Sequence, residues 1–76
     1  MAQESIPRRG YRSEFRQRQA EETRSRVVAA AAELFAADGY ARTTLAKIAA
    51  AAGVSTETVQ GQGSKAKLLI ASAEYA

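Results

Sequence analysis

The sequence predicts an all-α fold: a three-helix, helix-turn-helix (homeodomain-like) bundle followed by the start of a fourth helix. Three observations lead to this fold class. Apolar residues recur three and four positions apart along residues 20–37 and 45–52, which is the period of a helix. A glycine comes shortly after each stretch, where helices commonly end. A chain of 76 residues also has room for one domain only.

The composition limits the stability and the chemistry of this domain. Alanine supplies 18 of the 35 apolar residues, so the core is light and we expect marginal stability. The chain contains no Cys and no His, which excludes disulfides, thiolate nucleophiles and imidazole acid–base chemistry. We therefore expect no enzyme activity, no metal and no cofactor. No apolar run approaches the ~20 residues of a membrane span, and the first five residues lack the apolar core of a secretion signal. These features predict a cytoplasmic protein without membrane contact.

Residues 1–19 are expected to form a flexible, Arg-rich arm ahead of a folded domain over residues 20–76. Residues 1–26 hold seven Arg against four Glu, whereas acidic and basic residues balance over residues 27–76. Ile6-Pro7 and Gly10 disfavour a helix before about Arg12. The polar residues 13–23 either extend the next helix or fray. Such an arm is suited to reach DNA phosphates through Arg8, Arg9 and Arg12, although a solvated tail fits its composition equally well.

The first firm helix is expected over residues 20–37. Val27, Ala31, Leu34 and Phe35 share one face at helical spacing, and this face would enter the core. Asp38-Gly39 would end the helix, with Gly39 in the left-handed conformation. Tyr40 would then fold back onto the core.

The next two helices are expected over residues 45–52 and 55–60, joined by a tight corner. Thr44 and Ser55 can cap their N-termini, because a hydroxyl oxygen can accept an unpaired backbone N–H. Gly53 can take the left-handed conformation at the corner. The residues expected to face inward are Leu45, Ile48, Ala49, Ala52, Val54 and Val59. In a helix-turn-helix the second helix enters the DNA major groove, but an ordinary helical hairpin would give the same corner.

The C-terminal part is expected to contain a flexible link, Gly61-Gln62-Gly63, and a helix over residues 64–75 capped by Ser64. Leu68 and Leu69, with Ser72 or Ala73, would pack this helix against the earlier ones. The sequence stops without a helix-stop signal, which suggests that it is the front part of a longer protein.

Several segments in register resemble the TetR (tetracycline-repressor-like) family. They are Val27–Tyr40 (VVAAAAELFAADGY), Thr43-Thr44, Ile48-Ala49, Ala52-Gly53-Val54-Ser55 and Ser64-Lys65. The resemblance covers about residues 24–71 and implies a bacterial transcription regulator, usually a repressor. It implies double-stranded DNA as the partner, with a palindromic operator read by a homodimer. It also implies a C-terminal domain, absent from this chain, that dimerises and binds a small-molecule effector.

The resemblance also implies which residues contact DNA. Thr44 and Lys65, each at the start of a helix, would bind phosphates. Four residues, Thr56 to Thr58 and Gln60, match positions from which the recognition helix reads the groove. The complete set of candidate DNA-binding residues is Thr43, Thr44, Ser55, Thr56, Glu57, Thr58, Gln60 and Lys65, with Arg8, Arg9 and Arg12 of the arm.

The chemistry of these side chains suits base readout. Thr56 and Gln60 are four residues apart and share the outer face of their helix. Gln can pair with adenine through two hydrogen bonds, and Thr can contact a thymine methyl group. Glu57 can accept a hydrogen bond from cytosine, or it can simply complement the helix dipole. For Thr56, Gln60 and Lys65 the competing interpretation is an ordinary solvated polar surface.

The chain departs from the family pattern at the end of the recognition helix. The family usually has Tyr at the position of Gln60, and an aromatic residue shortly before the Ser-Lys pair, where this chain has Gly61-Gln62-Gly63. The departure predicts a shorter or more mobile third helix and weakens the expected contacts of Gln60 and Gln62. It also supports a competing hypothesis, in which the chain is a helical protein-interaction module that has lost DNA binding.

Overall fold

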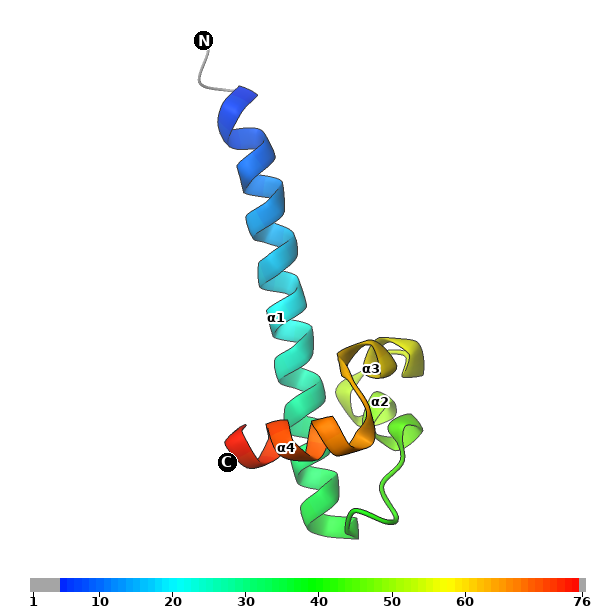
Figure 1. Cartoon of the computed structure of the whole chain (residues 1–76). Coiled ribbons are helices and arrows are strands. Elements are labelled where there is room, and N and C mark those ends of the chain that lie inside the picture. The colour runs from blue at the N-terminus through cyan, green and yellow to red at the C-terminus, as the bar shows by residue number, and fades with distance from the viewer. Residues whose placement is uncertain (1–4, 76) are drawn as a thin grey trace.

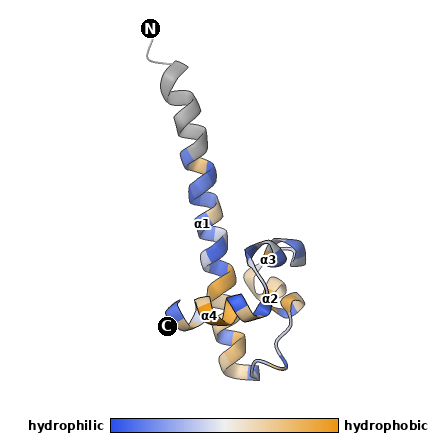
Figure 2. Cartoon of the chain, viewed as in Figure 1, coloured by the Kyte–Doolittle hydropathy of each residue, from blue (hydrophilic) through white to orange (hydrophobic). Residues whose placement is uncertain are grey.

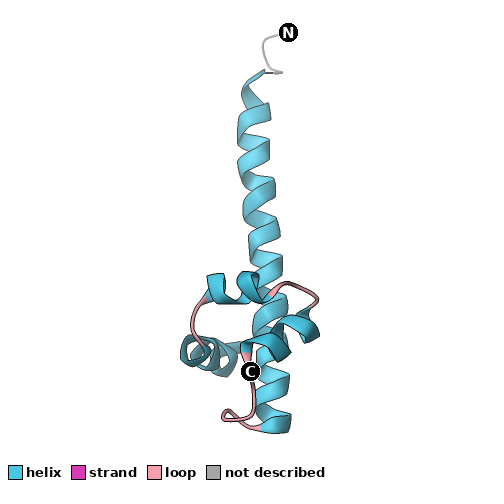
Figure 3. Cartoon of the chain, turned by 90° about the vertical axis from the view of Figure 1, so that its right-hand side faces the viewer, coloured by secondary structure: helices cyan, strands magenta, loops and turns pink. Residues whose placement is uncertain are grey.

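The computed structural model describes the backbone of residues 5–75 and the side chains of residues 14–74. Four helices make up this part of the chain: α1 (Ser5–Asp38), α2 (Leu45–Ala52), α3 (Thr56–Gln62) and α4 (Lys65–Tyr75). Because the described residues contain helices and no strand, the all-α prediction is confirmed. α1 is a long rod whose C-terminal half carries the other three helices (Figure 1). The view turned by 90° shows the N-terminal half of α1 standing clear of them (Figure 3).

The start of α1 differs from the prediction. The helix begins at Ser5, so a non-helical arm over residues 5–19 and a helix start near residue 20 are wrong. Pro7 is the third residue of α1, where backbone N–H groups have no intrahelical partner, so its missing N–H costs no hydrogen bond. Residues 13–23 therefore extend the helix.

The core lies between the C-terminal half of α1 and the three shorter helices. Its fully buried large side chains are Val27 from α1, Ile48 from α2, Val59 from α3 and Leu68 from α4. Leu34, Phe35, Leu45 and Val54 pack around this cluster and are partly buried. Apolar colour accordingly fills the lower part of α1 and its contact with α4, whereas the described part of α1 above them is mainly hydrophilic (Figure 2).

The corner between α2 and α3 has the predicted geometry. Thr44 and Ser55 cap their helices, accepting hydrogen bonds from the N–H groups of Lys47 and Thr58, each at 3.1 Å. Gly53 is left-handed, with φ 75°, and its N–H bonds the carbonyl oxygen of Ala49 at 2.9 Å. Small alanines at buried positions 49 and 52 allow α3 to cross α2 closely.

The junction between α3 and α4 is shorter than predicted. Gly61 and Gln62 belong to α3, so the expected flexible link is reduced to Gly63 and Ser64. Ser64 caps α4 as predicted, because its hydroxyl oxygen accepts the N–H of Lys67 at 3.2 Å. Of the expected packing residues, Leu68 is buried but Leu69 is 40% exposed. Ser72, one helical turn after Leu68, takes the inward position and is buried, while its hydroxyl donates to the Leu69 carbonyl.

Candidate nucleic-acid interface

α3 divides its residues between a buried face and an exposed face. Val59 is fully buried and anchors the helix in the core, whereas Thr56, Glu57 and Gln60 are exposed. Thr56 and Gln60 stand one turn apart on this exposed face. α3 reaches Gln62, two residues beyond its expected end at residue 60. The structure therefore brings three of the predicted readout residues together on one accessible surface.

Ser55 and Thr58 form the N-terminal cap of this helix. Their hydroxyl oxygens lie 2.9 Å apart, and the Ser55 oxygen also accepts the N–H of Thr58. Each hydroxyl thus already has an internal partner. This pair fixes the first turn of α3, and Glu57 in the same turn complements the positive end of the helix dipole.

The N-terminus of α2 is a second exposed polar region. Thr44 is exposed, and its hydroxyl oxygen accepts the N–H of Lys47 while its hydroxyl hydrogen remains available as a donor. The N-terminus of a helix attracts anions, because its unpaired N–H groups carry partial positive charge. Thr44 is therefore suitably placed to bind a phosphate oxygen.

Thr43 does not lie on this surface, and its assignment as a DNA-contacting side chain is wrong. Thr43 is fully buried, and its hydroxyl donates to the Gly39 carbonyl oxygen at 2.8 Å. Its N–H is shared between the carbonyl oxygens of Gly39 and Tyr40, both at 3.2 Å. These hydrogen bonds of Thr43 stabilise the loop between α1 and α2 directly before Thr44.

Lys65 at the start of α4 reaches across to the same loop. Its Nζ donates to the carbonyl oxygens of Tyr40 at 2.8 Å and of Thr43 at 2.9 Å. The ammonium also lies over the Tyr40 ring, 4.3 Å from its centroid, and this ring packs against Phe35 at 5.5 Å. The side chain is half-buried, and two of its three N–H groups are engaged inside the domain.

The family assignment follows from a comparison of the sequence with known proteins. The profile of the family described as bacterial regulatory proteins, tetR family, matches residues 27–71. The chain belongs to the TetR family. It carries the helical DNA-binding domain of a transcription regulator. No curated protein and no solved structure gives a significant match to the chain.

The matched region of this TetR-family domain begins at Val27, where α1 becomes buried. Before this point the described arginines of α1 (Arg16, Arg18, Arg24 and Arg26) are all exposed. Arg8, Arg9 and Arg12 lie on the same helix, but their side chains are outside the described residues. In the sequence, the charge excess of residues 1–26 is the feature that includes these additional arginines.

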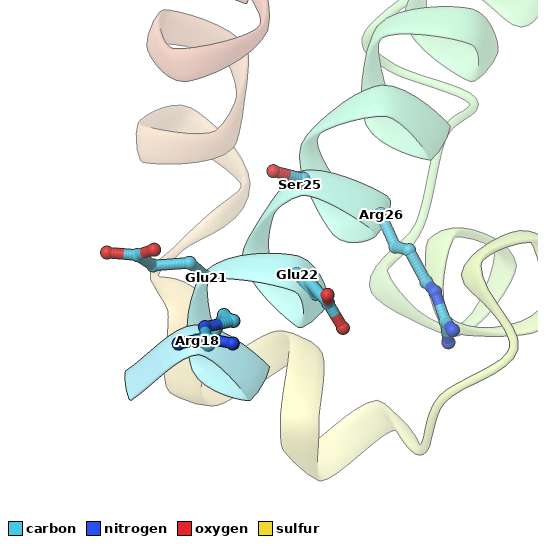
Figure 4. Close-up of a pocket in the computed structure, with 5 residues that line it drawn as sticks. All are labelled: Arg18, Glu21, Glu22, Ser25 and Arg26. Carbon is cyan, nitrogen blue, oxygen red and sulfur yellow. The ribbon is translucent and has the colours of Figure 1, made fainter. Parts of the chain in front are cut away.

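Two further features of the TetR-family domain concern its charged surface. The exposed Lys47 ammonium lies 3.9 Å from the Asp38 carboxylate and donates to the Arg42 carbonyl oxygen at 3.3 Å. A shallow hollow on α1 is lined by Arg18, Glu21, Glu22, Ser25 and Arg26 (Figure 4). All five side chains are exposed and come from one helix, so the hollow lies between neighbouring side chains on an open helix surface.

Within the described residues, no group of three or more acidic, His or Cys side chains is placed to hold a metal ion. No helix among them has the length and apolar character needed to cross a membrane.

Proposed function

We propose that this TetR-family chain binds a specific DNA sequence and acts as a transcriptional repressor. The observation that carries the proposal is the division of α3, in which Val59 is buried while Thr56, Glu57 and Gln60 are exposed together. A short helix held by one buried residue can present its other face to a groove. Thr56 and Gln60 supply the hydroxyl and amide groups that read base edges, and one good bidentate pair contributes roughly 1–3 kcal/mol of discrimination.

Phosphate contacts would orient this helix on the duplex. Thr44 offers its hydroxyl hydrogen at the positive end of α2, and it is exposed. The arginines of α1 add positive charge beyond the globular part, and we include Arg8, Arg9 and Arg12 among them. Such contacts fix position but carry little sequence information. Base readout would therefore fall to α3.

The wider regulatory role is also part of the proposal. A homodimer would read a palindromic operator, because two-fold symmetry places one recognition helix in each half-site. A small-molecule effector would act through a separate C-terminal domain. Joining two copies of this chain through an artificial dimeriser should tighten binding by 10²-fold or more, as expected from effective concentration.

The test is fluorescence anisotropy of this chain with a labelled random duplex over a series of salt concentrations. Each phosphate contact should contribute about −0.9 to the slope of log affinity against log salt. A slope of several units supports phosphate binding, and selection from a random duplex library then tests sequence preference. Absence of binding at low salt would contradict the proposal.

A second experiment addresses the competing protein-interaction hypothesis, which the exposed Leu69 and Ile70 on α4 favour. Glu57→Gln and Gln60→Ala change only the exposed face of α3. Both variants should fold normally and alter the selected sequence. If neither changes DNA affinity or the selected sequence, the recognition role of α3 is wrong.

A further inference from the structure

Lys65 of α4 contacts the loop that precedes α2. Its ammonium binds the carbonyl oxygens of Tyr40 and Thr43 at 2.8 and 2.9 Å, and it lies over the Tyr40 ring. These partners are 25 and 22 residues away in the sequence. One side chain of α4 therefore ties the loop between α1 and α2 to the rest of the domain.

We propose that Lys65 is a positioning residue of the DNA-binding site, which holds the loop so that Thr44 is presented to a phosphate. The Thr43 carbonyl belongs to the peptide unit that joins Thr43 to Thr44. Binding this oxygen therefore restricts the backbone directly before the first turn of α2. The proposal deepens the proposed function and rests on it for the DNA partner, but the loop-holding contact can be tested without DNA.

The chemistry favours this role over a contact made chiefly to DNA. An ammonium has three N–H donors, and the loop carbonyls occupy two of them. Hydrogen bonds from a charged donor are stronger than neutral ones, and the face of an aromatic ring attracts a cation. A phosphate could take the remaining donor, but binding there would add to the loop contact and would not replace it.

The first test uses the unchanged chain and NMR of its lysine ammonium groups. Lys67, two residues along α4, is exposed and serves as the internal reference. The Lys65 ammonium should exchange its protons with water at least tenfold more slowly than that of Lys67, because its N–H groups are bonded to carbonyls. Equal exchange rates would overturn the proposal, and this result does not depend on any variant folding.

The second test compares Lys65→Met with the matched control Lys67→Met by amide hydrogen exchange. The Thr43 N–H reports the loop, because it bonds Gly39 and Tyr40. The Val59 N–H, bonded to Ser55, reports α3. In Lys65→Met the Thr43 amide should exchange about tenfold faster relative to Val59, as loss of a charge-assisted hydrogen bond predicts. Lys67→Met should leave this ratio unchanged. Equal acceleration of both amides in Lys65→Met would contradict a specific loop role.

The third test measures DNA affinity in a double-mutant cycle of Lys65→Met and Thr44→Ala with the random duplex at low salt. If Lys65 acts through Thr44, its substitution should weaken binding several-fold in the unchanged chain but have little further effect beside Thr44→Ala. Additive effects of the two substitutions would show that Lys65 acts on DNA binding independently of Thr44 and would refute the positioning role. If the unchanged chain shows no binding, the proposed function fails while the exchange tests still decide whether Lys65 holds the loop.

Discussion

The two halves of α1 form one continuous helix but have different surroundings. Around Val27, Ala31 and Leu34 the helix packs against α2, α3 and α4. Among residues 14–26 only Thr23 is even partly buried, and four arginines point into solvent. In the packed half, contacts with the other helices limit which side chains fit. In the protruding half, the residues are limited mainly by the need to form a helix and to keep its charge. A helix can thus carry positive charge well beyond the core that stabilises it.

The largest expected effect comes from the packed region. Ile48→Ala should lower the free energy of unfolding by about 2–5 kcal/mol, because Ile48 is fully buried and its truncation leaves a cavity. Ile70→Ala is the matched control, since Ile70 is 62% exposed and should change stability by less than about 0.5 kcal/mol. Urea denaturation followed by circular dichroism measures both. A similar loss of unfolding free energy in the two variants would contradict the burial of Ile48 in the core.

Backbone conformation gives the next largest effect, at the corner between α2 and α3. Gly53→Ala should cost about 1–2 kcal/mol, because Gly53 has φ 75° and the left-handed region is unfavourable for other residues. Gly61→Ala is the control, and its change in stability should have the opposite sign. Gly61 lies inside α3 with open space around it, so alanine should stabilise the helix by about 0.4–1 kcal/mol. Thermal unfolding distinguishes the two signs, and a gain from Gly53→Ala would contradict the described corner.

Loss of a helix cap should have a smaller effect on the same region. Ser55→Ala removes the acceptor for the Thr58 N–H and should destabilise the domain by about 1 kcal/mol. Ser55→Asn, which can still cap the helix, should retain most of the stability. Chemical denaturation of both variants provides the check. Equal stability of the alanine and asparagine variants would show that this hydrogen bond is unimportant.

The protruding half should show the smallest effect on stability. Deleting residues 1–19 should change the free energy of unfolding by less than about 0.5 kcal/mol, because the described side chains in this segment are exposed. The same deletion should reduce the salt dependence of DNA binding by about 0.9 for each lost phosphate contact. Denaturation and anisotropy on the same sample separate these effects. A large loss of stability with an unchanged salt slope would contradict this division, in which the packed half stabilises the fold and the protruding half binds phosphates.

Local chemistry made most of the fold predictable. The caps at Thr44 and Ser55, the left-handed Gly53 and the buried Ile48 all follow from spacing and residue type within one or two turns. The start of α1 cannot be predicted from Pro7 alone, because a proline in the first turn loses no hydrogen bond and is compatible with a helix. Leu69 is 40% exposed because Leu68 and Ser72, four residues apart, take the inward positions of α4.

The candidate site was predictable only in part. The pairing of Thr56 and Gln60 on the exposed side of α3 follows from their four-residue spacing, and the burial of Val59 follows from its apolar side chain. The burial of Thr43 and the reach of Lys65 to Tyr40 depend on contacts between segments far apart in the chain. No local pattern shows that a threonine beside a helix start faces inward, or that a lysine already has two carbonyl partners.

The single buried anchor of α3 has a consequence for how such a protein can change over generations. Because Val59 is the buried residue of α3 and Thr56, Glu57 and Gln60 are exposed, substitutions at these three positions should leave the interior packing intact. If α3 reads DNA as proposed, mutation would explore new operator preferences one residue at a time without first passing through unstable intermediates. Alanine supplies four of the nine buried apolar residues in the described part of the chain, so we expect marginal stability. Under the proposed function, this separation would make the regulator both evolvable and open to retargeting by design.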